Sequence, residues 1–409
     1  MSAAGSRTSS LKAIPAGIWA LGFVSLLMDV SSEMIHALLP VYLVTAMGAS
    51  MATVGLIEGV AEAIAHIVKV FSGALSDWLG RRKLLAAIGY GLAAFTKPVF
   101  PLAPSIGWLV AARFIDRVGK GIRGAPRDAL VADLAPPHLR GASFGLRQML
   151  DTIGAFLGPL AAILLMWLLA DDFRSVFWVA VIPAFLSLAL IVFVVREPAR
   201  APGLRKVRAP LSIGELKRLG ADYWAVVVVS MLFALARFSE AFLILRAEGA
   251  GLMLVLVPVT LVVMNIAYAL SAYPAGALSD RVNRMSVLLV GLALLVAADI
   301  VLAFSGGVMG ILIGVALWGV HMGFTQGLFA ALVADTAPAE LRGTGFGAYN
   351  LMSGLMTLVA SVLAGALWDA HGPAATFLAG AGFAALCAIG VVALRPRFAA
   401  DRRNGGSPN

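Results

Sequence analysis

The chain has 409 residues, of which 60% are hydrophobic and only 13% are charged. Soluble domains are nearer half apolar and a quarter charged, so this composition excludes an ordinary soluble protein and predicts an all-α, polytopic membrane protein. The formal net charge is +9, but the basic residues stand at the ends of apolar segments. We therefore expect no nucleic-acid partner. The single cysteine, Cys387, excludes an intramolecular disulfide.

Apolar segments long enough to span a bilayer, about 20 residues each, occur twelve times, centred near residues 27, 61, 93, 120, 157, 185, 234, 263, 295, 321, 358 and 385. The first follows a short polar stretch (MSAAGSRTSSLK) and contains Asp29 and Glu33, which indicates an uncleaved span and not a signal peptide. Lys and Arg concentrate in alternate loops, whereas the opposite loops contain only Arg174 and Arg246. This asymmetry predicts a multi-pass protein of the cell (inner or plasma) membrane with both termini in the cytoplasm.

The first two predicted spans carry ionisable side chains at helical spacing. Asp29, Glu33 and His36 are four and three residues apart, which places them on one face of a helix. The second span continues the pattern with Glu58, Glu62, His66 and Lys69. An ionisable side chain at bilayer depth costs about 2.5–3.5 kcal/mol on insertion scales, so each is expected to face a partner or a watery cavity. The pattern fits either a proton-coupling or cation site or a set of structural ion pairs.

The fourth predicted span, which begins ARFIDRVGKGIRGAPRDA, has the highest density of charge. It contains Arg113, Asp116, Arg117, Lys120, Arg123, Arg127 and Asp128. Some of these bases are expected to neutralise carboxylates of spans one, two and five, among them Asp151. The remaining bases are expected to form either an anion-binding wall or a balanced network with the acids of spans one and two.

The second half has fewer polar side chains in its spans. We expect them to form the other wall of a central cavity: Arg237, Glu240, Asn265, Tyr268, His321, Gln326, Tyr349 and Asn350. A lone histidine such as His321 is more often a hydrogen-bonded helix residue than a ligand.

Two duplications relate the halves of the chain. GALSD occurs at 73–77 and again at 276–280, an offset of 203 residues. ALVADLAPPHLRGASFG at 129–145 matches ALVADTAPAELRGTGFG at 331–347 in twelve of 17 positions, an offset of 202. These repeats predict two parallel six-helix halves, residues 1–195 and 221–398. The polar connection at 196–220 is predicted to be a cytoplasmic linker, and the final stretch DRRNGGSPN indicates a disordered tail at 399–409.

Over almost its whole length the chain resembles the major facilitator superfamily. The family's pattern between spans two and three is Gly-x-Leu-Ser/Ala-Asp-Arg/Lys-x-Gly-Arg-Arg/Lys, and this chain has GALSDWLGRRK and GALSDRVNRMS. The glycines allow close helix approach, and the aspartates can accept hydrogen bonds from a helix N-terminus or pair with arginine. The resemblance implies a cytoplasmic gate formed by Gly73, Asp77, Arg81, Arg82, Gly276, Asp280 and Arg281. A plain structural clamp is the alternative.

Spans four and five extend the resemblance. Arg113 stands at the position of the family's span-four arginine, in the pattern Arg-x-x-x-Gly-x-Gly-x-Gly; in relatives this arginine is linked to proton coupling. Gly119 and Gly121 fit the pattern, while Arg117 replaces its first glycine. GAFLGP in span five, with Gly154, Gly158 and Pro159, resembles the core of an antiporter motif of drug and metabolite exporters. Small residues permit tight packing and proline permits a kink, and the motif favours export.

These observations predict a secondary active transporter that works by alternating access, as a monomer without a cofactor. We expect proton-coupled efflux of a small charged solute: an organic anion, a zwitterion or a metal chelate. The site residues are then Asp29, Glu33, His36, Glu62, His66, Arg113, Asp116, Arg117, Lys120, Arg123, Asp151, Arg237, Glu240 and His321. The alternatives are a nickel- or cobalt-type metal exporter, an importer of an anionic metabolite, and export of a hydrophobic drug. A membrane enzyme or a receptor is disfavoured, since no nucleophile–base set, HExxH motif or large extramembrane segment is present.

Overall fold

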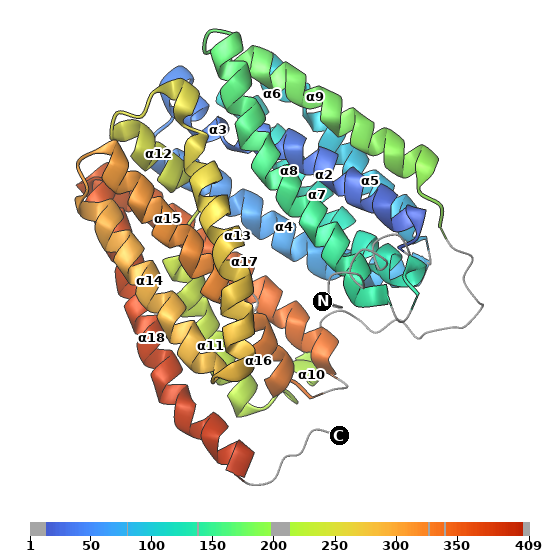
Figure 1. The fold of residues 1–409 in the computed structure, drawn as a ribbon, viewed down its shortest axis with the longest axis vertical. Coiled ribbons are helices and arrows are strands. Elements are labelled where there is room, and N and C mark those ends of the chain that lie inside the picture. The colour runs from blue at the N-terminus through green and yellow to red at the C-terminus, as the bar shows by residue number, and fades with distance from the viewer. Residues whose placement is uncertain are drawn as a thin grey trace, which may run out of the picture. The chain divides into compact units, whose positions relative to one another are not determined.

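A computed structural model describes residues 14–79, 81–136, 139–197, 213–325, 328–338 and 341–403, and the regular structure in these ranges is helical (Figure 1). Ten helical segments of the described chain are long and apolar enough to cross a membrane. Two further helices of 29 residues, α4 and α7, bring the number to twelve. The predicted all-α fold with twelve spans is confirmed, and each predicted centre falls inside one of these segments.

The elements of the first half, in chain order, are α2 (Ala16–His36), α3 (Leu39–Val41), a π-helical segment (Tyr42–Ala46), α4 (Met51–Leu79), α5 (Arg82–Thr96), α6 (Val99–Leu102), α7 (Ile106–Leu134), α8 (Arg140–Leu168), α9 (Phe173–Ala189) and a second π-helical segment (Leu190–Val194). Those of the second half are α10 (Ile213–Leu216), α11 (Ala221–Ala236), α12 (Ala241–Gly249), a 3₁₀ turn (Leu254–Leu256), α13 (Val259–Arg281), α14 (Arg284–Phe304), α15 (Val308–Thr325), α16 (Leu328–Thr336), α17 (Arg342–His371) and α18 (Pro373–Arg403).

Several predicted spans are interrupted helices. The third span changes from α5 to α6 at Lys97 and Pro98, where proline lacks the N–H that a continuous helix needs. The seventh span is broken without a proline: α11 ends at Ala236, Arg237 leaves the helical region with φ −110° and ψ 73°, and α12 begins at Ala241. Non-helical backbone at membrane depth is tolerated where protein buries it or where it lines a cavity.

By their internal contacts the residues form two compact units. Unit 1 comprises residues 1–47, 64–209 and 254–259, and unit 2 comprises 48–63, 210–253 and 260–409. The main division falls in the predicted linker, of which residues 198–212 lie outside the described part of the chain. Helix α4 contributes its first turns to unit 2 and the rest to unit 1. Helix α18 continues to Arg403, and residues 404–409 lie outside the described part of the chain, so the disordered tail at 399–409 stays a prediction.

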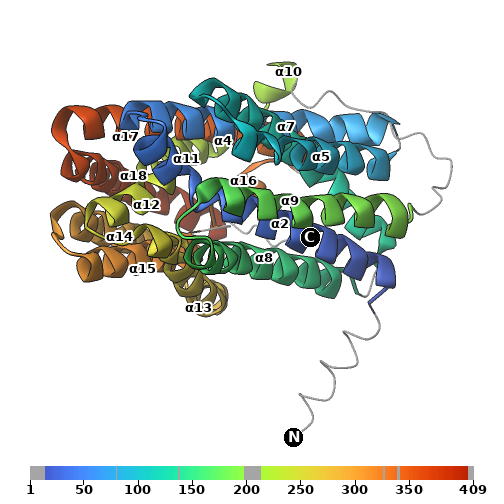
Figure 2. The same cartoon turned by 90° about the horizontal axis from the view of Figure 1, so that it is seen from above.

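In unit 1, α2 lies against α8 and α9, and α5 lies against α7 (Figure 2). The α5–α7 contact is close because glycines face each other: a Cβ added to Gly89 would lie 2.6 Å from the carbonyl oxygen of Gly119, and the reverse distance is also 2.6 Å. Such small residues allow helices to associate in a bilayer, where apolar burial gives no net driving force. The apolar core beside this contact includes Leu21, Val24 and Tyr90.

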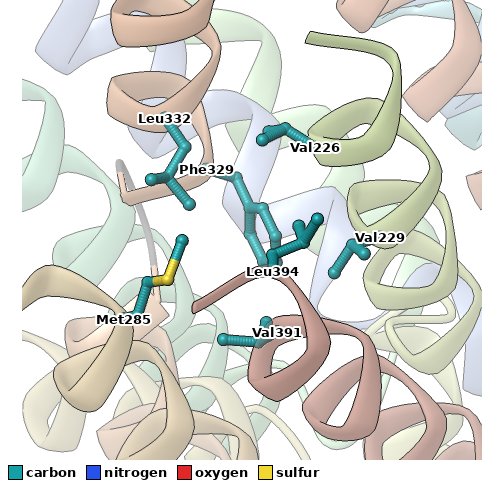
Figure 3. Close-up of a pocket in the computed structure, with 7 residues that line it drawn as sticks. All are labelled: Val226, Val229, Met285, Phe329, Leu332, Val391 and Leu394. Carbon is teal, nitrogen blue, oxygen red and sulfur yellow. The ribbon is translucent and has the colours of Figure 1, made fainter. Parts of the chain in front are cut away.

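In unit 2, α14 packs between α15 and α18, and α11 packs on α17 and α18 (Figure 1). The core between α11, α14, α16 and α18 encloses a small pocket (Figure 3). Its lining is entirely apolar: Val226, Val229, Met285, Phe329, Leu332, Val391 and Leu394. A charged solute would find no hydrogen-bond partner among these side chains, so the pocket reflects imperfect core packing and is not a candidate site.

Candidate functional site

The polar centre of unit 1 is built on α7. Arg113, Asp116, Arg117 and Arg123 are at most 6% exposed, although α7 is a long helix of a membrane protein. Lys120, on the same helix, is exposed. The predicted span-four charges are therefore mostly buried within the unit, where each needs a partner or water because an isolated buried charge is very costly.

A buried ion pair joins α7 to the end of α5. Lys97 Nζ lies 3.0 Å from Asp116 Oδ1 and donates a second hydrogen bond, at 3.1 Å, to the hydroxyl of Ser32 on α2. Both charged side chains are almost fully buried. Lys97 is absent from the predicted site residues, although a lone lysine in the apolar run AAFTKPVF costs enough at membrane depth to signal a function or a partner.

A second set of contacts connects α7 to α2 and α5 through Tyr90. The guanidinium of Arg123 lies over the Tyr90 ring at 4.9 Å, a cation–π contact. The Tyr90 hydroxyl is 3.2 Å from that of Ser25, which also accepts a hydrogen bond of 2.9 Å from Arg127. Two arginines of α7 are thereby held in place by neutral groups, which leaves their positive charge uncompensated by these contacts.

Further along α7 the charges form a four-membered network with α8. Arg147 lies 2.8 Å from Asp151 and 3.4 Å from Asp128, and Arg127 lies 3.2 Å from Asp128 and 3.6 Å from Asp151. Asp29 of α2 is near enough for the charges of Asp151, Arg123, Arg127 and Lys120 to act on it. Of the predicted site residues, the structure thus brings Asp29, Arg123 and Asp151 together, with the bases of α7 and α8.

The glycines of GAFLGP lie where α8 crosses α2. A Cβ added to Gly154 would be 3.0 Å from the Cβ of Asp29, and one added to Gly158 would be 2.5 Å from the Cβ of Glu33. Larger residues there would push α8 away from the two acids. Pro159 follows inside α8, which continues to Leu168.

The candidate residues of α4 are divided between the units. Glu58, only 1% exposed, and Glu62 belong to unit 2, whereas His66 belongs to unit 1 with Glu33 and His36. Among the described residues, no group of three or more His, Cys, Asp or Glu side chains could hold a metal ion. The predicted metal-ligating set of Asp29, Glu33, His36, Glu62 and His66 is therefore not assembled in this structure.

In unit 2 the candidate residues surround the break between α11 and α12. Arg237 is in the break and Glu240 is its last residue before α12; the charges of Glu240, Tyr268 and Tyr349 act on Arg237. His321 of α15 is fully buried, with its ring edge-on to Trp318 at 5.2 Å. Asn350 instead donates to the carbonyl of Phe346 in its own helix, at 2.8 Å. Gln326 lies outside the described residues.

One ionisable residue of unit 2 was not predicted to be part of the site. Asp299 lies in α14 and is fully buried. Its signal in the sequence is a single acid in the apolar run LVAADIVLAF, the same kind of signal as Lys97.

The first gate motif ends α4 and begins α5. Arg82 pairs with Asp133 at the end of α7 and donates to the carbonyl of Ala129 at 2.8 Å. Glu197 accepts from the backbone N–H groups of Arg82 and Lys83, at 2.6 and 3.3 Å. The N-terminal N–H groups of α5 thus gain an acidic partner, as helix N-termini favour.

The second gate motif has a matching pair. Arg284 lies 2.9 Å from Asp335 of α16, and Asn283 caps α14 by accepting from the N–H of Met285. Asp133 and Asp335 were not among the predicted gate residues, although both belong to the repeated ALVAD. In the gate itself, Gly73 leaves room against Ala125, with a Cβ distance of 3.4 Å, and Arg81 is exposed. The side chains of Asp77, Asp280 and Arg281, and the surroundings of Gly276, lie outside the described part.

Comparisons with known proteins agree with this architecture. The sequence model of the Major Facilitator Superfamily matches residues 21–361 and again residues 262–408. An uncharacterized MFS-type transporter of Methanocaldococcus jannaschii is 34% identical over 371 residues, which cover 89% of this chain and 91% of that protein. Multidrug resistance protein MdtH of Yersinia enterocolitica is 29% identical over 213 residues, 51% of this chain and 50% of that protein.

The fold is also found among solved structures. A bacterial homologue of the human lysosomal transporter Spinster has a TM-score of 0.76 over 96% of this chain and 98% of its own. Its sequence is only 15% identical, so the likeness concerns the fold alone.

Proposed function

We propose, from the premise that this chain belongs to the Major Facilitator Superfamily, that it is a proton-coupled transporter that exports a small organic anion. Family membership makes the chain a multi-pass membrane protein and a secondary transporter, not an enzyme. The solute class, the coupling to protons, the direction and the site residues are our proposal. The cytoplasmic position of both termini remains a prediction from the charges of the loops.

The observation that carries the proposal is the excess of positive charge at the polar centre of unit 1. Five acids are present there: Asp29, Glu33, Asp116, Asp128 and Asp151. Seven bases face them or lie along the same helices: Lys97, Arg113, Arg117, Lys120, Arg123, Arg127 and Arg147. Guanidinium groups bind carboxylates in a fork-like, bidentate geometry, so this concentration of arginines on α7 and α8 suits an anionic solute.

Proton coupling is supported by the way the arginines are paired. Asp151 is within 3.6 Å of both Arg127 and Arg147. A proton on Asp151 or on the neighbouring Asp29 would remove a negative charge that competes with the solute for these arginines. Proton binding and anion binding are then linked through shared partners, and such linkage is reciprocal.

Export is supported by two resemblances. MdtH, which matches half of this chain, is named a multidrug resistance protein, and the GAFLGP sequence resembles the antiporter motif of exporters. A second candidate, import of an anion together with protons, is favoured by the pairing just described. Protonation that frees an arginine promotes anion binding to the same state, which is the behaviour of a symporter.

Reconstituted protein separates these candidates. Proteoliposomes with a pH-sensitive dye would be tested with benzoate, succinate and citrate under pH gradients of either sign. Export predicts that an internal anion leaves as protons enter; symport predicts that an external anion enters with protons. Arg117→Ala should abolish either flux and Arg117→Lys should retain part of it, whereas Arg174→Ala, in the first turn of α9 and outside the polar centre, serves as the control. Solute flux without any proton flux would contradict the coupling.

A thermal-stability screen tests the solute class independently of transport, because a ligand that binds the folded state raises its melting temperature. We expect carboxylates to stabilise the wild-type protein and Arg117→Ala to remove the effect. Stabilisation by Ni²⁺ or Co²⁺ that is lost in Asp29→Ala and His36→Ala would instead support the metal exporter and contradict our proposal.

A further inference from the structure

The carboxyl group of Asp299 lies in an apolar part of unit 2 and has no ion partner among the residues that the structure describes. Its relative exposure is 0%, and neither Oδ1 nor Oδ2 makes a hydrogen bond to any described residue. The residue lies in α14, between α15 and α18. A buried polar group without a partner is rare in proteins and calls for an explanation.

Glycine makes room for this carboxyl group. A Cβ added to Gly380 of α18 would lie 2.7 Å from Asp299 Oδ2 and 3.0 Å from Cε1 of Phe238. Asp299 and Phe238 therefore meet at the same point on α18. The Phe238 ring contacts the rings of Trp318 and Phe377, with centroid distances of 5.4 and 5.5 Å. The surroundings of the carboxyl group are thus aromatic and aliphatic.

Charged and titratable groups do occur on the neighbouring elements, but none pairs with Asp299 among the described residues. His321 is on α15, and Arg237 and Glu240 flank Phe238 in the break between α11 and α12. Arg246 of α12 donates to the carbonyls of Leu302 and Ser305 at 2.9 and 2.6 Å, at the C-terminal end of α14 and about one to two turns beyond Asp299.

An ionised carboxylate in this position would carry a large desolvation penalty with nothing to offset it. The neutral acid avoids most of that penalty and loses only its hydrogen bonds to water, which costs far less than burying the charge. Burial with no partner among the described residues therefore favours the protonated form of this carboxyl group in this conformation. A merely structural position would be better served by leucine or asparagine, since neither carries a proton whose removal creates a buried charge.

We propose that Asp299 is a proton-binding site of the second half, and that its proton exchanges with water when the break at Arg237–Glu240 rearranges. The proposal rests on the proposed proton coupling and adds a second site to it. Phe238, which meets Asp299 at Gly380, is part of that break. Interrupted helices are where membrane transporters expose polar groups to their cavities. The step is a proton transfer between water and a carboxylate oxygen, and no other bond forms or breaks.

Infrared spectroscopy of the full-length protein tests proton binding without any knowledge of the solute. We expect the wild type at neutral pH to show the carbonyl stretch of a protonated carboxylic acid, and Asp299→Asn to lack it. Asp171→Asn is the matched control, since Asp171 is an exposed aspartate of the α8–α9 loop. Loss of a carboxylate band in Asp299→Asn, in place of the acid band, would overturn the proposal. If that variant aggregates, Asp299→Glu must keep an acid band at a displaced frequency.

Exchange of the proton is tested by transfer to D₂O. A proton that takes part in a working cycle should be replaced while the protein stays folded, which shifts the acid band. If the acid band keeps the frequency that it has in H₂O until the protein unfolds, the proton does not exchange in the folded protein. That result would also overturn the proposal.

A flux measurement separates this inference from the proposed function. In the proteoliposomes described above, Asp299→Asn should lower the proton flux per solute moved, whereas Asp171→Asn should not. If the wild type moves solute without protons, the proposed coupling fails even though the infrared result can stand. If the wild type couples normally and Asp299→Asn leaves the ratio unchanged, only the present inference fails.

Discussion

The guanidinium of Arg284 lies 2.9 Å from the carboxylate of Asp335, and in the first half Arg82 pairs with Asp133, although the GALSD offset of 203 residues aligns Arg284 with Arg81. Each pair joins the end of a GALSD motif to the ALVAD segment of the same half. The two internal repeats are therefore structurally connected, because in each unit an ion pair links the segment after GALSD to ALVAD. The aspartate of each pair belongs to the ALVAD repeat, and the arginine lies in the segment that follows GALSD.

The two pairs should differ in their contribution to stability. Arg284 and Asp335 are 43% and 56% exposed, so Asp335→Ala should cost about 0.2–1 kcal/mol or less. Arg82 and Asp133 are 13% and 29% exposed and Arg82 also binds Ala129, so Asp133→Ala should cost more, about 1.5–3 kcal/mol. Melting temperatures of the two purified variants in detergent measure this difference. Equal losses would show that burial does not distinguish the pairs.

The buried pair of Lys97 and Asp116 predicts a strongly non-additive double mutant. Lys97→Met leaves Asp116 charged and buried without its main partner, and breaking such pairs typically costs about 3–5 kcal/mol. Replacing both residues, with Lys97→Met and Asp116→Leu, removes the uncompensated charge and should restore most of the stability. A double-mutant cycle of thermal unfolding measures the coupling. Lys83→Met, at the start of α5 and partly exposed, is the control and should have little effect.

Asp172, in the loop before α9, predicts an acid-dependent loss of stability. Its carboxylate accepts hydrogen bonds from the hydroxyl of Ser175 at 2.6 Å and from the N–H of Arg174 at 3.0 Å. These bonds, that from Ser175 first, lower the pKa of Asp172 below its ordinary value. The folded-state pKa is thus below the unfolded one, so the contribution is complete above about pH 4 and is lost as the pH falls through the depressed value.

Asp172→Ala should therefore lower the melting temperature at neutral pH and have a smaller effect in acid. The measurement is the melting temperature across this pH range for the wild type and the variant. Asp171→Asn serves as the control, because Asp171 has a positive φ of 62° that asparagine also tolerates. A constant difference between wild type and Asp172→Ala at every pH would contradict the assignment.

The twelve spans could be predicted because a bilayer requires long apolar helices, and each such helix is a continuous apolar segment of the sequence. The internal repeats could likewise be identified from the amino-acid sequence alone. The interruption between α11 and α12 could not be predicted. The sequence has no proline at this point, so the departure of the Arg237 backbone from the helical region depends on packing against other helices.

The candidate site was only partly predictable for a related reason. Helical spacing shows which residues share a face, as for Asp29 and Glu33, but it does not show which helix packs on that face. The Lys97–Asp116 pair and the network of Arg147 with Asp128 depend on such packing. Asp299 is the opposite case. Its isolation in an apolar run was visible in the sequence, whereas the absence of a partner for it among the described residues became evident only from the packing of α14, α15 and α18.

The first turn of α4 provides the last prediction. Within unit 2, Asp369 near the end of α17 accepts hydrogen bonds from the N–H groups of Met51 and Ala52, at 3.0 and 2.8 Å. The carboxylate thus caps a helix that is more than 300 residues away in sequence, where a negative charge also complements the helix dipole.

Asp369→Ala should cost about 0.5–2 kcal/mol, the usual range for a lost N-cap, and should accelerate hydrogen exchange at Met51 and Ala52. Asp369→Asn should retain part of the protection, because its amide oxygen can still accept one of the two bonds. His371→Ala, two residues further along α17, is the control for a general effect on the end of that helix. Hydrogen exchange followed by mass spectrometry of the α4 peptide measures the result. Faster exchange throughout α17 but not at the start of α4 would mean that Asp369 stabilises its own helix and does not cap α4.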